Sequence, residues 1–343
     1  MANTGSRLVF LGCYTHGEGG DGTGIVAARR EPGRAALRTP ELVAVTPSPS
    51  YVARHPTADV LYAVNELAEG RLTAFRVAAD GGLAELGTWP TGGSLPCFVA
   101  VTPDGRHALV TNYGTGSVAS FVLDEHGVPS HRGDLAQHVG AGRHPERQEG
   151  PHAHSVAITD EGVLALDLGL DTVYRYRIDP ATGQLGAGEP LLRTRPGTGP
   201  RHLAAAGPDL LYLVGELDAT VNTYARTGGR WHDVATVATS VGADPLPSEI
   251  AVSPDGRYLY VANRGPDTIA VFSLADGKPS RVGEVATGGR WPRHFTIVDG
   301  HLYVANQQSD LVTAFALDPV TGMPVPTGDV LRTPSPSCVL FYD

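Results

Sequence analysis

The sequence predicts an all-β fold, a seven-bladed β-propeller that residues 1–343 form as a single domain. A proline opens each of seven similar segments, at intervals of 44 to 55 residues. Each segment continues into a short apolar stretch, a turn with Gly or Asp, and a second apolar stretch that commonly ends in Asn. A recurring period of this size indicates a repeat architecture. The seven prolines are Pro49, Pro96, Pro151, Pro200, Pro247, Pro292 and Pro336.

The clearest copy of the repeat, residues 247–263, predicts two strands joined by a turn. Ile250–Val252 and Tyr258–Ala262 are rich in β-branched and aromatic residues, and Pro-Asp-Gly lies between them. A third strand follows in most copies, at Thr268–Phe272 in this one, and then a weaker fourth strand. Four strands in about 45–50 residues make one propeller blade.

The two ends of the chain are predicted to share the seventh blade. The last copy, residues 336–341, has room for one strand only. The first strands, at Leu8–Gly12 and Gly24–Ala28, lack an opening strand of their own. Pairing the two ends closes the ring and removes the free edges of an open sheet. A helical solenoid is excluded because no segment sustains a period of 3.6 residues.

The composition agrees with a closed propeller and predicts a cytoplasmic protein. Forty-three Gly and 27 Pro are spread through the turns, and no apolar run is long enough to cross a membrane. The polar start, residues 1–7, predicts no signal peptide. Cys13, Cys97 and Cys338 are odd in number and lie in strand-like segments, which predicts buried free thiols rather than a redox pair.

The charge distribution predicts a small anionic ligand. A net charge of −10 argues against nucleic acid or an anionic membrane as a partner. Six of the 13 histidines nevertheless lie within residues 126–154. Four more cationic or imidazole groups directly follow repeat prolines, namely Arg201, His202, Arg293 and His294. The sequence makes no prediction of the oligomeric state.

Hairpin geometry brings two columns of residues together at the central channel. If the Pro-Asp-Gly turn lies at one end of a blade, the start of strand one and the end of strand two meet at the other end. One column at that end is nearly uniform and is interpreted as structural, through side-chain bonds to loop backbone (Asn65, Asn112, Asn263 and Asn306). The next column varies from blade to blade, as expected for a site built on a constant scaffold (Glu66, Glu216, Arg264 and Gln307).

Several motifs resemble those of the lactonase family of seven-bladed propellers, which includes bacterial 6-phosphogluconolactonases and fungal carboxymuconate lactonizing enzymes. They cover nearly the whole chain in the family's order, and include Arg147-Gln-Glu-Gly-Pro-His-Ala-His-Ser155, Gly199-Pro-Arg-His202, Gly215-Glu-Leu217, Asn263-Arg-Gly265 and Pro292-Arg-His294. The resemblance implies a catalytic cluster of His154, Arg201, Glu216 and Arg264.

These four side chains suit lactone hydrolysis, which needs a base, a donor to the oxyanion and a group that binds the substrate's charge. Glu216 or His154 can serve as the base, and the two arginines can bind a phosphate or carboxylate. We therefore expect a hydrolase of a small anionic sugar lactone, similar to 6-phosphogluconolactonase. The expected substrate-binding residues are His152, His202, Glu66, Arg293, His294, Gln307, Arg147 and Gln148.

Other interpretations stay open at this point. The same constellation would suit a carboxymuconate cycloisomerase, in which a carboxylate adds to an alkene, or a propeller that only binds small anions. Arg201 and Glu216 could form a purely structural ion pair. His152 and His154, two apart on a strand and so expected on one side of it, could bind zinc, but no third and fourth ligand follow at metal-site spacing. We predict no metal and no cofactor.

Residues 124–150 form the longest departure from the repeat and are predicted to be a loop insertion. Two interpretations are equal for this segment, a solvated surface loop and a flap at the rim of the channel. Arg147 and Gln148 are the residues expected to face the channel.

Overall fold

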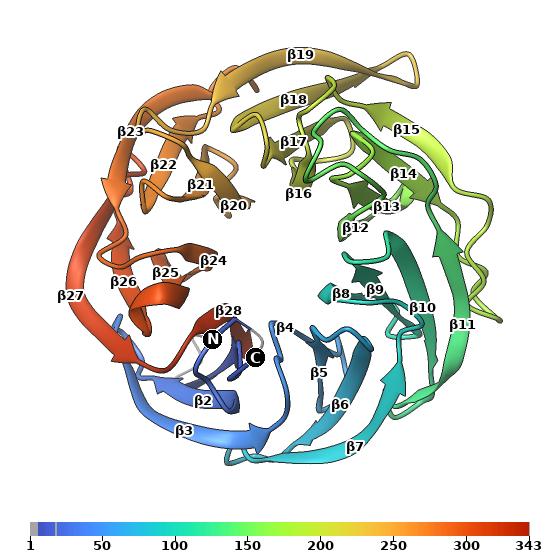
Figure 1. The fold of residues 1–343 in the computed structure, drawn as a ribbon. Coiled ribbons are helices and arrows are strands. Elements are labelled where there is room, and N and C mark those ends of the chain that lie inside the picture. The colour runs from blue at the N-terminus through green and yellow to red at the C-terminus, as the bar shows by residue number, and fades with distance from the viewer. Residues whose placement is uncertain (1–5, 18, 343) are drawn as a thin grey trace.

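Seven four-stranded antiparallel sheets surround a central axis in the computed structural model of the chain (Figure 1). The structure describes residues 6–17 and 19–342. The prediction of a seven-bladed propeller is confirmed for these residues. Most of the polar start that predicted no signal peptide, residues 1–5, lies outside them.

Each blade begins with an inner strand near the axis and ends with an outer strand at the circumference. Blade one contains β28 (Pro336–Tyr342), β1 (Arg7–Cys13), β2 (Gly24–Arg30) and β3 (Leu37–Val45). Blade two contains β4 (Tyr51–Arg54), β5 (Val60–Asn65), β6 (Arg71–Val77) and β7 (Leu83–Pro90). Blade three contains β8 (Pro96–Val101), β9 (His107–Asn112), β10 (Ser117–Leu123) and β11 (Pro129–Gln137). Blade four contains β12 (Ala153–Thr159), β13 (Gly162–Asp167), β14 (Thr172–Tyr176) and β15 (Glu189–Arg193).

The remaining three blades repeat the same order. Blade five contains β16 (Pro200–Ala205), β17 (Leu210–Gly215), β18 (Thr220–Thr227) and β19 (Arg230–Ala238). Blade six contains β20 (Leu246–Val252), β21 (Tyr258–Arg264), β22 (Thr268–Ser273) and β23 (Ser280–Ala286). Blade seven contains β24 (Pro292–Val298), β25 (His301–Asn306), β26 (Leu311–Leu317) and β27 (Pro324–Arg332), with a short 3₁₀ helix, η1 (Gln307–Ser309).

The C-terminal strand closes the ring, as the sequence predicted. β28 is the inner strand of blade one and pairs antiparallel with β1, so that Leu8 lies opposite Tyr342 and Val9 opposite Phe341. In Figure 1, β28 lies beside the first strands of the chain in this blade. Blade one therefore packs between blades seven and two, through contacts of β28 with β24 and with β4.

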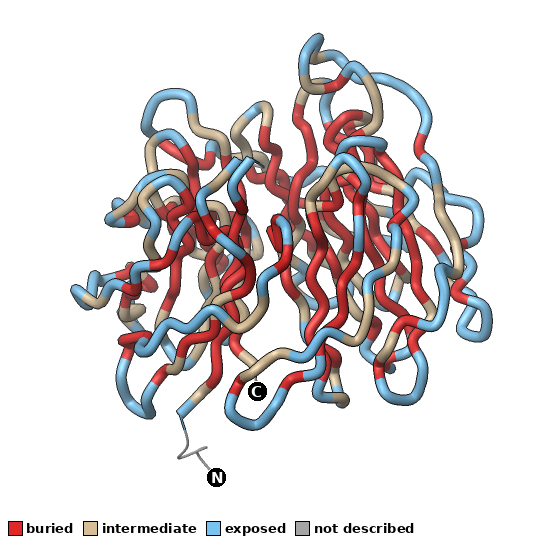
Figure 2. Tube along the Cα trace, turned by 60° about the horizontal axis from the view of Figure 1, so that its bottom comes forward, coloured by how far each residue is buried: buried red, intermediate tan, exposed pale blue. Residues whose placement is uncertain are grey.

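Apolar side chains between neighbouring sheets form the core, which Figure 2 shows as buried segments along the strands. A fully buried tyrosine recurs on the second strand of several blades. Its hydroxyl donates to a turn carbonyl of the following blade, from Tyr62 to Gly127, from Tyr212 to Gly277 and from Tyr260 to Gly322. The aromatic ring is buried in the core, and the hydroxyl group has a hydrogen-bond partner in the next blade. These residues therefore hold adjacent blades in register.

The predicted loop insertion is shorter than expected. Residues 129–137 form β11, the outer strand of blade three, so the irregular part of this segment is the connection at 138–152. We call residues 138–152 the rim loop. His138 Nδ1 lies 2.5 Å from the buried carboxylate of Asp167, and Gln148 accepts bonds from the backbone of Arg143 and His144. Gln148 Nε2 also donates to the carbonyl of Leu168, at 2.8 Å, so this bond and the His138 contact fix the loop against blade four.

A β-bulge follows the opening proline of several inner strands. The pairing of inner and second strands shifts between Pro200 and His202 in blade five, and between Pro292 and His294 in blade seven. A bulge places an extra residue in one strand and redirects the side chains beside it. As a result, two successive residues can face the channel where a regular strand would offer only one.

The described part of the chain holds no helix with the length and hydropathy of a membrane span.

Candidate active site

A cavity of about 260 Å³ lies at the axis, at the end of the blades where the inner strands begin. Residues of all seven blades line it. This placement follows from the repeat, because each blade brings the start of its inner strand and the end of its second strand to the same end of the sheet.

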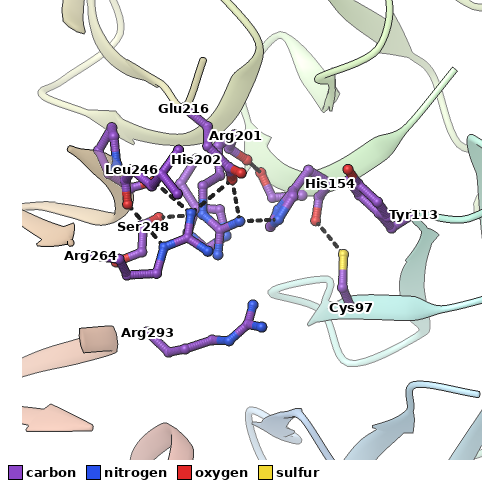
Figure 3. Close-up of polar contacts among 12 residues, drawn as sticks. Cys97, Tyr113, His154, Arg201, His202, Glu216, Leu246, Ser248, Arg264 and Arg293 are labelled. Atoms are coloured by element: carbon purple, nitrogen blue, oxygen red, sulfur yellow. Dashed lines mark hydrogen bonds and ion pairs between the residues drawn. The ribbon is translucent and has the colours of Figure 1, made fainter. Parts of the chain in front are cut away.

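Glu216 is the centre of the charged cluster in this cavity (Figure 3). It directly follows β17, and its carboxylate accepts bonds from three arginines of different elements. Arg147 Nη2 lies 2.7 Å from Oε1, while Arg201 Nη1 lies 2.7 Å and Arg264 Nη2 3.1 Å from Oε2. One carboxylate thus aligns three guanidinium groups.

The electrostatics of this cluster keep Glu216 ionised. Burial alone would raise the pKa of the carboxyl, but Arg264, Arg201 and Arg147 together hold it well below its usual value. Burial lowers the pKa of Arg264 to about 9, against the pull of Glu216 in the other direction. That value still leaves the guanidinium charged at neutral pH.

Backbone carbonyls fix the orientation of two of the arginines. Arg201 Nε donates to the carbonyl of Ser248, at 2.9 Å, and Arg264 Nε donates to that of Leu246, also at 2.9 Å. The Arg264 guanidinium also lies over the ring of Trp291, 5.4 Å from its centroid. Both side chains are buried, so the cluster is rigid before any ligand enters.

His154 is a neutral imidazole held by Arg201. Its Nε2 accepts from Arg201 Nη1, at 2.5 Å, so the ring proton is on Nδ1, a buried atom with no partner among the described residues. Burial, and then the neighbouring Arg201, lower the pKa of His154 well below its usual value. The ring packs edge-on against Tyr113, with centroids 5.7 Å apart.

The rim loop contributes Arg147 to the cavity. Besides Glu216, this side chain donates to the hydroxyl of Tyr113, from Nη2 at 3.1 Å. Arg147 is about one third exposed, the most open of the arginines bound to Glu216. The rim loop is therefore part of the wall of the site, and Arg147 is its contribution.

Arg293 lies on the other side of the cavity and is held apart from Glu216 (Figure 3). Its Nε donates to Oε1 of Gln307, at 2.7 Å, and the guanidinium carbon lies 4.7 Å from the centre of the Tyr14 ring. Tyr14 in turn donates to Glu66, at 2.7 Å. Nη1 and Nη2 of Arg293 make no hydrogen bond within the described residues, so they remain for a ligand in the cavity.

Two histidines share one buried carboxylate in the wall of the cavity. His202 Nδ1 lies 3.0 Å from Glu249 Oε1, and His294 Nε2 lies 3.4 Å from Glu249 Oε2. Burial would raise the pKa of Glu249, but the two imidazoles, a hydrogen bond from His202 and the backbone N–H of Ile250 lower it overall. The carboxylate is therefore ionised, and its hydrogen bond fixes the orientation of the His202 ring.

The structure brings together most of the residues that the sequence singled out. All four expected catalytic residues line the one cavity, as do five of the expected substrate-binding residues, namely Glu66, Arg147, His202, Arg293 and His294. Three expected binding residues do not line it, namely His152, Gln307 and Gln148.

Each of these three has a structural contact instead. The pairing of β12 with β13 shifts between Ala153 and Ser155, so the alternation expected from His152 to His154 is broken. His152 stacks on Tyr113 and bonds its carbonyl, at 2.9 Å from Nδ1. Gln307 supports Arg293, and Gln148 is fully buried within the rim loop.

Sequence reasoning did not identify Tyr14 and Trp291 as residues of the site, although both line the cavity. Trp291 directly precedes a repeat proline and adopts a left-handed backbone conformation, with φ of 63°. Leu246, the residue before Pro247, also lines the cavity. For Trp291 the signal was therefore present in the position before the proline, whereas the prediction used the positions after the proline and those at the end of the second strand.

The three cysteines are free thiols, as predicted; Cys13 and Cys338 are buried, whereas Cys97 is only partly buried. Burial raises the pKa of Cys97 to about 12, so the thiol stays protonated although it lines the cavity. Nowhere in residues 6–17 and 19–342 do three or more His, Cys, Asp or Glu side chains come together in an arrangement that could hold a metal ion.

Comparison with known proteins gives one consistent relationship. Residues 8–341 match the family "Lactonase, 7-bladed beta-propeller". The chain is 32% identical to the 6-phosphogluconolactonase of Bacillus subtilis, over 97% of each chain. Among solved structures, it is similar to the periplasmic gluconolactonase of Pseudomonas aeruginosa, with a TM-score of 0.90 and 31% identity over 99% of each chain. A Bacteroides fragilis protein gives a TM-score of 0.91 at 29% identity, covering 100% of this chain and 99% of that one.

The match extends over nearly the full length of the chain, includes every blade and agrees with the resemblance seen in the motifs. The chain belongs to the lactonase family of seven-bladed β-propellers.

Proposed function

We propose that this protein hydrolyses the lactone of a sugar acid that carries a phosphate, as in 6-phosphogluconolactone. The observation that supports this substrate class is the arrangement of four arginines around one cavity. Three of them are bound to Glu216, and the fourth, Arg293, has two free guanidinium nitrogens on the other side.

The charge balance of the cavity suits a dianion. Four arginines and two glutamates, Glu66 and Glu216, are the charged side chains in its wall besides the histidines. They leave an excess of two positive charges, and a phosphate monoester carries about −1.5 to −2 at neutral pH. The volume, near 260 Å³, is below the roughly 300–1,000 Å³ of pockets for drug-sized ligands, and so it fits a small metabolite.

The two sides of the cavity have different roles in this proposal. Arg293 binds the phosphate, because its planar fork of donors can bond two phosphate oxygens at once. The lactone carbonyl then lies toward Arg201 and Arg264. Each of these has one terminal nitrogen without a protein partner among the described residues, so both can donate to the oxyanion that forms when water attacks.

Glu216 suits a positioning role better than the role of base. Both of its oxygens accept bonds from arginines, and its lowered pKa makes it a weak proton acceptor. His154 has its Nε2 lone pair bound by Arg201. We therefore propose that these two residues hold the arginines in place.

The cycloisomerase alternative is not proposed, because the named relatives above are lactonases. Between sugar lactones, the relatives differ, since one is named for a phosphorylated substrate and the other for an unphosphorylated one. In this chain, the two free guanidinium nitrogens of Arg293 favour the phosphorylated substrate.

The test compares 6-phosphogluconolactone with glucono-δ-lactone as substrates of the purified protein, with acid release followed above the rate of spontaneous opening. We expect a higher kcat/KM for the phosphorylated lactone. Arg293→Ala should raise KM for that substrate by about 10- to 100-fold, the equivalent of about 1.5–3 kcal/mol for a hydrogen bond to a charged group, and should change the reaction of the uncharged lactone little.

Arg290→Ala is the matched control, since Arg290 is exposed and does not line the cavity. No acceleration of either lactone by the wild-type protein would refute the proposed function. Equal losses for both substrates in Arg293→Ala would refute phosphate binding at Arg293.

A further inference from the structure

We propose that His202, held by the buried carboxylate of Glu249, is the group that moves the proton in lactone hydrolysis. This inference rests on the proposed function and assigns the one chemical role that the arginine cluster leaves empty. The juxtaposition that supports it is an imidazole in the cavity wall with a carboxylate behind it.

The tautomer of His202 follows from its partner. Glu249 accepts hydrogen bonds and offers none, so the imidazole proton is on Nδ1, which lies 3.0 Å from the carboxylate. Nε2 therefore presents a lone pair. This nitrogen has no hydrogen-bond partner among the described residues. It is not fully enclosed by protein atoms, and His202 lines the cavity, so Nε2 is open to it.

On its far side Glu249 faces His294 through an ion-pair contact of 3.4 Å, without a hydrogen bond. His294 Nδ1 accepts from the backbone N–H of Val339, at 3.3 Å, which leaves the proton of His294 on Nε2, facing Glu249. His294 thus has no lone pair free for the cavity. His202, Glu249 and His294 come from three successive blades. In this row His202 has the place of the base, and Glu249 has the place of the group that orients it.

Other groups in the wall are poorer bases. Glu216 and the Nε2 lone pair of His154 are bound by arginines, and Cys97 is protonated. Glu66 accepts a hydrogen bond from Tyr14 and lies near Arg293, on the side of the cavity where the phosphate binds. Its carboxylate would repel the phosphate there, and it lies away from the lactone carbonyl. His202 lies instead next to His154, with ring centroids 5.2 Å apart, and so beside Arg201.

The proposed steps balance as follows. His202 Nε2 takes one proton from water as the water oxygen bonds to the lactone carbonyl carbon, and Arg201 and Arg264 stabilise the oxyanion. The C–O bond of the ring then breaks, and His202 returns the proton to the departing alkoxide. The product is an open hydroxy acid, whose carboxyl group releases a proton to water. Glu249 accepts the Nδ1 hydrogen bond throughout and stabilises the imidazolium.

The first test is the pH profile of the wild type, His202→Gln and Glu249→Gln. Loss of a general base typically lowers the rate about 10²–10⁴-fold. We expect His202→Gln to lower kcat by this amount with little change in KM, and to abolish the acidic limb of the profile. Glu249→Gln should lower kcat less and move that limb to lower pH, because the imidazolium loses its carboxylate partner. The groups that also face His202 are His154 and, through Glu249, His294.

His232→Gln is the matched control, because His232 is exposed on the outer strand of the same blade. An unchanged acidic limb in His202→Gln would overturn the inference, as would its loss in Glu66→Gln with His202→Gln near wild type.

A second measurement does not depend on turnover. Nitrogen-15 NMR of the histidine rings, with His202 assigned by the His202→Gln spectrum, reports which ring nitrogen is protonated. We expect Nδ1–H and a bare Nε2 at neutral pH in the wild type, with the preference lost in Glu249→Gln. A proton on Nε2 would overturn the assignment even if the protein opened neither lactone, and failure of the proposed function alone would leave the NMR result as expected.

Discussion

At the scale of single residues, the buried histidines of the cavity make the stability of the fold depend on pH. His154 has a pKa well below its ordinary value of 6.5, because it is buried and lies against Arg201. The neutral ring is therefore favoured in the folded protein, while the unfolded chain binds a proton near the ordinary value. Stability from this group is fully present above pH 6.5 and is lost as the pH falls below it.

We predict that the free energy of unfolding decreases between neutral pH and about pH 5, and that His154→Gln makes this decrease shallower. One such proton accounts for a slope of at most about 1.4 kcal/mol per pH unit. Urea unfolding across this range measures the slope. The exposed His126→Gln serves as the control and should keep the slope of the wild type. His294 has a pKa lowered in the same direction, so some slope should remain.

At the scale of elements, an aspartate in the turn after a second strand holds the start of the next blade. Asp267 Oδ1 accepts from the backbone N–H of Trp291, at 2.7 Å, and Asp310 Oδ1 accepts from that of Ser335, at 2.8 Å. Trp291 and Ser335 both have positive φ and directly precede repeat prolines. This hydrogen bond stabilises a backbone conformation that is costly for a residue with a bulky side chain.

We predict that Asp267→Ala lowers the free energy of unfolding by about 1–3 kcal/mol, the cost of leaving a partly buried donor unpaired. It should also weaken substrate binding, because Trp291 packs on Arg264 and directly precedes β24, the strand that contains Arg293. Urea unfolding and KM measure the two effects. Asp276→Ala, in the turn of blade six before β23, is the control, and a similar loss in both variants would contradict the prediction.

The elements could be predicted more completely than their details. The prolines and turns predict four strands per blade because each copy repeats the same local chemistry. The bulges could not be predicted, since they depend on pairing between two strands, and this is why His152 was wrongly expected beside His154 in the cavity. The sequence alone also leaves open whether Glu216 or His154 is the base. The structure shows that arginines bind both Glu216 oxygens and the Nε2 lone pair of His154.

At the scale of the whole molecule, the ring depends on β28. We predict that a circular permutant folds to the native structure when residue 342 is joined to residue 6 by a short linker and the chain is opened at Gly228–Gly229, an exposed turn in blade five. Leu8 and Tyr342 are already paired, so the linker spans a short distance.

Truncation after Thr333 should have the opposite result, because it removes β28 and exposes the edge of β1. Size-exclusion chromatography and circular dichroism distinguish a profile like that of the wild type from aggregate. A folded and active truncation would show that closure by the C-terminal strand is dispensable.

The bulges after the repeat prolines also bear on how new specificity can arise on this ring. An extra residue in a bulge makes no regular ladder bond, so its side chain can be exchanged without altering the pairing of the blade. Arg201 in blade five and Arg293 in blade seven occupy such positions, because the pairing passes from Pro200 to His202 and from Pro292 to His294. A descendant of this protein could therefore acquire a different substrate through a few single-codon changes at the rim, while the seven sheets keep their strand pairing.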